Sequence, residues 1–378
     1  MKTMRSVKSL AIQDKLRVAR QELAEALIER DTEVDLVLTA CLTGEHVLLV
    51  GPPGTAKSLL LESVARWLDG RRFSCLLTKF TQMEELFGPV SLQGLKEDRF
   101  VRVTTGRLPE ADIGFLDEIF KSSSAILNTL LRILNERIFD DGSGLARPVA
   151  LKLCVAASNE WPSAQEGGQE LGALFDRLLF RHTVKPVMSG AGRERLLWSD
   201  NLTPRFSSRI TANELEQAQH EAARIPWSPS AREALEQILK ELFKEGVRPG
   251  DRRQRKAVQA ARAYAYLNGA SQVDPEHLEV LASILWDEPQ EQPQICARVI
   301  GKVANPAGLK VTGLLIEVEQ VLASTDVRNL TQAATAAAKL AEIERQLVPL
   351  KDSARGERAR AYVSDQLKKL KLASLEAH

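Results

Sequence analysis

The residues with the clearest chemistry in this sequence form a short turn near position 50. Between an apolar run and an amphipathic stretch stand Gly51, Pro52, Pro53, Gly54, Thr55, Ala56, Lys57 and Ser58. Glycines in such a turn let backbone N–H groups close around phosphate oxygens at the positive N-terminus of the following helix. Lys57 would contact the β- and γ-phosphates of ATP, and Ser58 would place its hydroxyl on Mg²⁺. The turn therefore predicts a phosphate-binding loop, or P-loop.

One position in this turn departs from the usual pattern. The standard motif has glycine immediately before the lysine, whereas this chain has Ala56. An alanine is tolerable there if its φ angle stays negative. The alternative is an ordinary Gly/Pro turn with a solvated lysine, and the turn alone leaves that alternative open.

A second segment carries two adjacent carboxylates at the end of an apolar run. Residues 113–116 read as a buried strand, and Asp117 and Glu118 follow it directly. In phosphoryl transfer, Asp117 would support the Mg²⁺ shell and Glu118 would polarise the water that attacks the γ-phosphate. A solvent-facing pair of acids is the alternative, and the upstream P-loop argues against it. The two segments together predict an ATPase that uses ATP and Mg²⁺.

The surrounding pattern shows how these groups would be positioned. Short β-rich runs alternate with amphipathic stretches between His46 and Lys185, which is typical of a parallel sheet covered by helices. Strand signals then stop, and helical spacing continues to the end of the chain with a polar, proline-bearing break at 287–293. We predict an α/β core with N-terminal helices over 1–188, a smaller helical domain over 189–290 and a three-helix tail over 291–378.

The composition argues against several other classes of protein. Acidic and basic residues nearly cancel to a net charge of +1, which gives no overall attraction to nucleic acid or an anionic membrane. The four cysteines and five histidines are scattered without metal-ligand spacing, so magnesium is the only metal expected. No signal-like start or long apolar run is present, and we expect a cytoplasmic protein without membrane insertion.

Further motifs resemble the MoxR family of AAA+ ATPases, over about residues 8–290. They are GRLPEA (106–111), FLDEIF (115–120), LL (130–131) and LNER (134–137), while FGPV (87–90) and DRRQRKA (251–257) are most like the RavA branch. The family's P-loop also commonly has alanine before the lysine. The resemblance implies a five-stranded parallel sheet of the AAA+ type, β-hairpin inserts at 88–106 and 138–150, and an α-helical lid. It also implies a homo-oligomeric, hexameric ring with ATP sites shared between subunits.

The resemblance assigns further roles inside the ATP site. Asn159 matches the sensor 1 residue that helps to orient the attacking water, although a capping asparagine is an alternative. Arg177 matches the arginine finger that reaches a neighbour's γ-phosphate. Arg181 is the rival candidate for that role, and a surface ion pair between Arg177 and Asp176 is another interpretation.

The lid is expected to carry one more basic residue of the site. Either Arg252 or Arg253 resembles the residue called sensor 2, and Arg252 is preferred.

Two classes of function are compatible with a ring ATPase of this kind. The first is a chaperone-like remodeller of protein clients, which the insert at 88–106 could contact through Lys96, Arg99, Phe100 and Arg102. A hairpin with a purely structural role is the alternative for this insert. The second is a nucleic-acid motor, for which the basic cluster 248–256 is the best argument. The first is favoured, because that cluster falls where a lid is expected. The family also implies a partner with a von Willebrand factor A domain, and the tail is either its adaptor or a packing brace.

Overall fold

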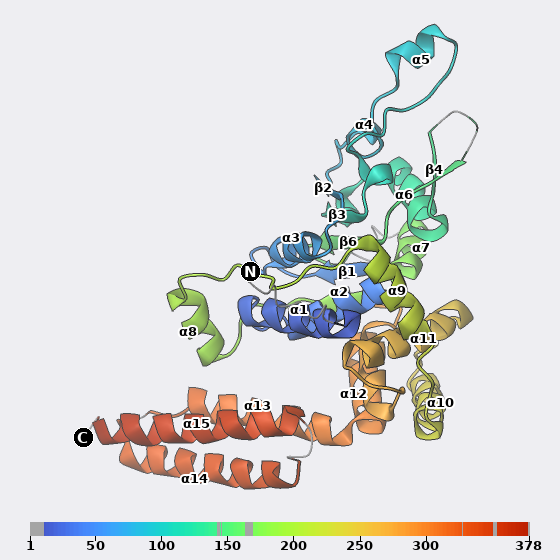
Figure 1. The fold of residues 1–378 in the computed structure, drawn as a ribbon. Helices are drawn as coiled ribbons and strands as arrows, with labels where there is room; N and C mark the ends of the chain where they lie inside the picture. Colours follow the sequence, from blue (N-terminus) through green and yellow to red (C-terminus); the bar gives the residue numbers. More distant parts are fainter. Residues whose placement is uncertain are drawn as a thin grey trace, which may run out of the picture. The chain divides into compact units, whose positions relative to one another are not determined.

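A parallel sheet of five strands lies at the centre of the P-loop part of the chain (Figure 1). Its strands are β1 (Val47–Val50), β2 (Arg72–Leu76), β3 (Ile113–Asp117), β6 (Leu153–Ser158) and β7 (Phe180–Thr183), in the order β2-β3-β6-β1-β7. Every residue of β1 and β6 is buried, as expected for strands covered on both faces. The predicted five-stranded parallel sheet is confirmed. Because all pairings are parallel, the carboxyl ends of the five strands share one edge.

The structure, a computed structural model, describes residues 11–141, 144, 146–162, 169–326, 328–350 and 354–376. These residues form two compact units, Met1–Cys296 and Ala297–His378. The first unit contains the sheet and the residues with predicted chemistry.

Helices surround the sheet in the first unit. They are α1 (Ile12–Ala26), α2 (Asp31–Thr43), α3 (Lys57–Trp67), α6 (Ser124–Glu136) and α7 (Gln169–Arg177). The apolar positions of α6 recur at helical spacing, and Leu127, Leu130 and Leu134 are buried as that spacing predicts. Because each strand ends at the carboxyl edge, α6 and α7 return toward the amino edge before the next strand begins.

The helical part that follows the sheet belongs to the same unit as far as Cys296, within α12. After β7 come α8 (Gly190–Trp198), α9 (Ala212–Ala223), α10 (Pro229–Lys244), α11 (Asp251–Leu267), the 3₁₀ helix η3 (Pro275–Ser283) and α12 (Gln292–Ala304). Helix α11 is fastened to the core by Lys256, whose Nζ lies 2.6 Å from Glu45 Oε2. Among the described residues no helix is both long and apolar enough to cross a membrane.

The two predicted inserts differ in structure. Strands β4 (Ile138–Asp140) and β5 (Ala146–Pro148) form the predicted antiparallel hairpin. In the other insert, which follows α4 (Met83–Phe87), a single bridge joins Val90 to Arg102 and the tip is the helix α5 (Leu92–Lys96). The expected hairpin is therefore limited to its stem. Ser91 explains the helix, because its side chain accepts a hydrogen bond from the Gly94 N–H and caps the first turn.

The second unit has a hydrophobic core of its own. Its helices are α13 (Pro306–Ala323), α14 (Leu330–Leu347) and α15 (Ala354–Glu376), and α12 crosses the boundary between the units. Their apolar stripes meet in one buried cluster that includes Val311, Val318, Leu340, Ile343 and Val363. Asn305 and Asn329 cap α13 and α14 with their side chains.

Candidate active site

The P-loop lies between β1 and α3, at the carboxyl edge of the sheet. Lys57 is the first residue of α3, and its buried Nζ donates hydrogen bonds to the carbonyl oxygens of Gly51 (2.6 Å) and Pro52 (3.0 Å). Burial lowers the pKa of Lys57, and the nearby carboxylates of Asp117 and Glu118 partly offset that effect. The ammonium is thus held inside the loop, close to the two acids.

Ala56 adopts the left-handed conformation, with a φ angle of 64°. The condition under which alanine was expected to be tolerable here, a negative φ, is therefore not met. The loop turns through the left-handed region at Gly54 (φ 78°) and again at Ala56 so that α3 can begin directly at Lys57. For an alanine this conformation costs on the order of 1–2 kcal/mol, whereas glycine adopts it freely.

The two acids lie at the end of β3, at the same carboxyl edge of the sheet as the P-loop. Asp117 is the last residue of β3, and its Oδ1 accepts a hydrogen bond from the Glu118 N–H at 3.0 Å. Glu118 is only 7% exposed and also has a left-handed backbone (φ 54°). Its Oε1 accepts a hydrogen bond from the Asn159 side chain, and its Oε2 lies 3.4 Å from Lys121 Nζ. The structure therefore brings Lys57, Asp117, Glu118 and Asn159 together.

These groups fit a nucleotide and a magnesium ion. Ser58 is exposed at the start of α3, and Asp117 is partly exposed at the end of β3, at the same edge of the sheet. The buried Glu118 Oε2 accepts no hydrogen bond from the described residues, so it is an acceptor without a full set of donors. Hydroxyl and carboxylate oxygens are ligands suited to Mg²⁺, which usually completes its shell with phosphates and water. Ser58 and Asp117 would hold the ion, and Lys57 with the loop N–H groups would hold the phosphates.

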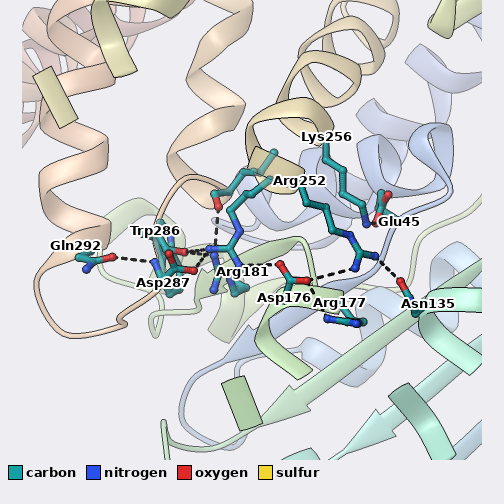
Figure 2. Close-up of polar contacts among 12 residues, drawn as sticks. Glu45, Asn135, Asp176, Arg177, Arg181, Arg252, Lys256, Trp286, Asp287 and Gln292 are labelled. Carbon is teal, nitrogen blue, oxygen red and sulfur yellow. Dashed lines mark hydrogen bonds and ion pairs between the residues drawn. The ribbon is translucent and has the colours of Figure 1, made fainter. Parts of the chain in front are cut away.

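A second cluster of charged residues gathers around Asp176 in α7 (Figure 2). Arg177 Nη1 lies 2.9 Å from Asp176 Oδ2, and Arg252 Nη1 lies 3.4 Å from the same oxygen. Arg252 also donates a hydrogen bond to the Asn135 side chain at the end of α6. The predicted finger and the preferred lid residue are therefore neighbours that share one carboxylate.

This cluster lies at the amino edge of the sheet, away from the P-loop of the same chain. Asn135 and Asp176 stand near the ends of helices that return to that edge, and Glu45, the partner of Lys256, precedes β1. The four residues of β1 separate the two edges by about 13 Å, since a parallel strand rises about 3.3 Å per residue. Arg252 thus does not lie at its own P-loop.

Arg181 and Arg253, the two rival candidates, are buried attachment points. Arg181 is 1% exposed, donates a hydrogen bond to the Ile284 carbonyl at 3.2 Å and lies 4.4 Å from the centroid of the Trp286 ring. Its burial lowers its pKa to about 9. Arg253 donates to the Trp286 carbonyl at 2.8 Å and pairs with Asp287. Both guanidinium groups are buried and bind acceptors of their own chain, which argues against either as a finger or a sensor.

Sequence reasoning missed one residue that contacts the P-loop. Arg30, between α1 and α2, is 5% exposed, and its Nε donates a hydrogen bond to the Thr55 carbonyl at 3.1 Å. A lone arginine between two helices normally reads as a surface residue. The only sequence signal was its place in a short polar segment before a helix, which many surface arginines share.

Comparisons with known proteins agree with this geometry. Residues 14–219, more than half of the chain, match a family model described as the MoxR domain in the MoxR-vWA-beta-propeller ternary systems. Residues 231–299 match an AAA lid domain. The fold and the P-loop define a AAA+ ATPase of the P-loop class. Within that class, the chain belongs to the MoxR family.

Individual relatives range from archaeal to bacterial proteins. The uncharacterized protein MJ0812 of Methanocaldococcus jannaschii is 38% identical over 312 residues, which are 82% of this chain and 80% of that protein. Chaperone MoxR1 of Mycobacterium tuberculosis is 28% identical over 193 residues, or 50% of this chain and 49% of that protein. A crystal structure from Cytophaga hutchinsonii, of a protein proposed to be an ATPase, superposes with a TM-score of 0.62 at 17% identity. It covers 77% of this chain and 95% of its own, and shows the fold alone.

The strain at Ala56 leads to a stability prediction. Ala56→Gly should raise the free energy of unfolding of the first unit by about 1 kcal/mol, because glycine adopts the left-handed conformation without strain. The greater backbone freedom of glycine in the unfolded chain keeps the gain below the full strain energy. Urea unfolding followed by tryptophan fluorescence measures it, since Trp67, Trp161, Trp198, Trp227 and Trp286 all belong to that unit. Ala125→Gly, at an exposed position in α6, is the control and should be destabilising. A loss of stability in both variants would contradict the prediction.

Proposed function

We propose that this chain hydrolyses ATP with Mg²⁺ and uses the energy to remodel partner proteins. The observation that carries the proposal is the meeting of Lys57, Asp117, Glu118 and Asn159 at the carboxyl edge of the sheet. Membership of the MoxR family supports ATPase chemistry. The name of the relative Chaperone MoxR1 supports a chaperone-like role.

Each residue of the site has a proposed part in hydrolysis. Lys57 would exchange its loop carbonyl partners for phosphate oxygens when ATP binds. Glu118 would accept hydrogen bonds from the attacking water, and Asn159, already bonded to Glu118, would help to fix that water in line. Bound Mg²⁺ supplies neutralisation of the charge that develops on the phosphates.

Replacement of Glu118 tests the hydrolytic step. Glu118→Gln should bind ATP with near-normal affinity and lose turnover by about a hundredfold or more, because the amide polarises water poorly. Fluorescent-nucleotide binding and phosphate release measure the two effects. Glu160→Gln, at an exposed acid next to Asn159, is the matched control and should turn over normally. Normal turnover by Glu118→Gln would remove Glu118 from the proposed role.

We further propose that Arg177 and Arg252 act on the ATP of another subunit. Both lie at the amino edge of the sheet, whereas their own P-loop lies at the opposite edge. Both are partly exposed, in contrast to Arg181 and Arg253. A ring in which this edge meets the neighbour's P-loop would complete each ATP site with two guanidinium groups, which would offset transition-state charge. A hexamer is the ring size that the family resemblance implies.

Mixing of inactive variants tests whether the site is shared. Arg177→Ala should keep ATP binding and lose turnover by about a thousandfold. Lys57→Ala should lose ATP binding but still present Arg177. An equimolar mixture of the two variants should recover up to about a quarter of wild-type turnover. In random rings, about a quarter of the interfaces place the intact P-loop of one variant against the intact Arg177 of the other.

The control mixture combines Arg177→Ala with the double variant Lys57→Ala/Arg177→Ala, which has no finger to supply. It should recover no turnover. Equal activity of the two mixtures would show that Arg177 does not act across an interface. The same design with Arg252→Ala tests the lid arginine.

We propose a protein client in preference to nucleic acid. In the basic cluster 248–256, Arg253 is buried, while Arg252 and Lys256 are paired with Asp176 and Glu45. Much of the positive charge that a phosphate backbone would need is therefore already paired. The insert tip, by contrast, exposes Leu92 and Phe100 beside the basic Lys96 and Arg99, a mixed surface suited to a polypeptide.

The partner is proposed to carry a von Willebrand factor A domain. The description of the matching family model, which places its MoxR domain in MoxR-vWA-beta-propeller systems, supports this choice. The second unit is the proposed adaptor, because it has a separate core and, from residue 300 onward, lies outside the matched ATPase and lid regions. The division into core (1–188), lid (189–290) and tail (291–378) is proposed with it. The RavA branch and the cytoplasmic location stay predictions of the sequence.

Removal of the second unit tests the adaptor role. Truncation after Asn305 keeps α12, whose Cys296 and Ile300 are buried, and removes α13 to α15. The truncated chain should bind ATP normally but should no longer retain the partner that full-length Glu118→Gln captures. Mass spectrometry of the captured proteins measures the difference. Equal retention would make the second unit a packing element, and recovery of nucleic acid by the full-length chain would reverse the choice of client.

A further inference from the structure

Arg30 joins the P-loop to the segment between α1 and α2. Its Nε donates to the Thr55 carbonyl at 3.1 Å, and its Nη1 donates to the Glu29 carbonyl at 2.7 Å. The guanidinium is 5% exposed and also lies 3.8 Å from the buried carboxylate of Glu33. Because it is enclosed and partnered on several sides, its position fixes the Thr55 carbonyl relative to the Glu29 backbone.

Glu29 continues this connection to α8. Its carboxylate accepts hydrogen bonds from the Met188 N–H (2.7 Å), the Ser189 N–H (3.0 Å) and the Ser189 hydroxyl (2.6 Å). Burial alone would raise the pKa of Glu29, but these hydrogen bonds outweigh it and lower that pKa. Ser189 is the N-cap of α8, because its hydroxyl oxygen accepts a hydrogen bond from the Gly192 N–H at 2.9 Å. The Glu29 carboxylate thus fixes the capping residue and places a negative charge just before the helix N-terminus, where it is favourable.

Two further features show that this contact is specific. Glu29 has a left-handed backbone, with a φ of 56°, which a glutamate adopts only at a cost. At Gly192, in the first turn of α8, an added Cβ would lie 2.3 Å from Glu29 Oε1. The carboxylate can therefore approach the helix only because residue 192 has no side chain.

Among the described residues, few other contacts attach α8 to the core, and Gly192 is the one buried residue of the helix. Its second half exposes Leu197 and Trp198, the latter at 80%. Apart from the Glu29 contacts, Arg195 Nη2 donates to the Glu25 carbonyl at 2.5 Å. A helix with so few buried contacts opens easily, and its stability then depends strongly on its cap. The segment after α8 leads to α9 and the lid.

We propose that Arg30 and Glu29 are positioning residues that couple nucleotide at the P-loop to the order of α8. This inference rests on the proposed function, since it requires a nucleotide at the P-loop. Bound phosphates take Lys57 away from the Gly51 and Pro52 carbonyls and fix the loop, including the Thr55 carbonyl. A fixed Thr55 carbonyl restrains the Arg30 side chain, which donates a hydrogen bond to it. Arg30 in turn restrains the Glu29 carbonyl, and the Glu29 carboxylate restrains the residues at the N-terminus of α8 through its hydrogen bonds.

Hydrogen exchange of the full-length chain, with and without MgADP, tests the coupling. In the wild type, MgADP should slow exchange of the α8 amides by about fivefold or more. Glu29→Gln keeps the size of the side chain but weakens the cap. Its α8 amides should exchange fast, and MgADP should no longer slow them. Its affinity for ADP should fall by no more than the factor by which MgADP slows α8 exchange in the wild type, because coupling between two sites is reciprocal.

Arg195→Met is the matched control, since it removes the hydrogen bond from Arg195 to the Glu25 carbonyl without touching the Arg30 connection. Its α8 amides should exchange faster in both states, and MgADP should still slow them. The inference is overturned if Glu29→Gln keeps the wild-type response, or if α8 of the wild type ignores ADP that is demonstrably bound. A wild-type chain that binds no ADP would instead overturn the proposed function, and the inference with it.

Discussion

The parallel direction of all five strands is the constraint on which the rest of this structure depends. It places every strand-to-helix turn at one edge of the sheet, where the P-loop, Asp117, Glu118 and Asn159 meet. It also returns every covering helix to the other edge, where Arg177 and Arg252 meet around Asp176. A single chain therefore presents the proposed phosphate-binding residues and the arginines proposed to offset transition-state charge at opposite edges of the sheet. The proposal of a site shared between subunits follows from this separation.

Buried arginines hold the parts of the first unit together around that sheet. Arg181 reaches from β7 to the carbonyl groups at 284 and 286, Arg253 reaches from α11 to the same stretch, and Arg30 reaches the P-loop. A buried guanidinium is costly without hydrogen-bond acceptors, so the carbonyl groups that these arginines reach contribute to the fixed position of each side chain. Among the described residues, Nε and Nη1 of Arg181 and Nε of Arg253 have no acceptor. Trp286 adds its ring face to Arg181. The position of the lid on the core is thus defined by directional polar contacts as well as by apolar packing.

The sequence predicted the features whose signals are local. Apolar runs of strand length predicted the sheet, and the residue types at 51–58 and 117–118 predicted the edge where they would meet. Features decided by distant neighbours were not predictable in this way. The left-handed φ of Ala56 is imposed by the loop, and the helix at the tip of the first insert depends on a single serine cap. The sequence did not reveal the buried positions of Arg30, Arg181 and Arg253, because their carbonyl partners carry no side-chain signal. For Arg181 and Arg253, which were candidates for the finger and for sensor 2, those partners are also distant in sequence.

The shared carboxylate of Asp176 gives the amino edge a property that neither arginine has alone. Arg177 belongs to the core helix α7, whereas Arg252 belongs to the lid helix α11. Their ion pairs with one carboxylate make the surroundings of the proposed finger depend on where the lid lies. Arg253, also on α11, is anchored at 286–287 and lies 3.7 Å from Asp176 Oδ1. A displacement of the lid would therefore change the charges around Arg177 directly. If the site is shared as proposed, the lid of one subunit acts on the ATP of another through Asp176, without requiring any distortion of the sheet.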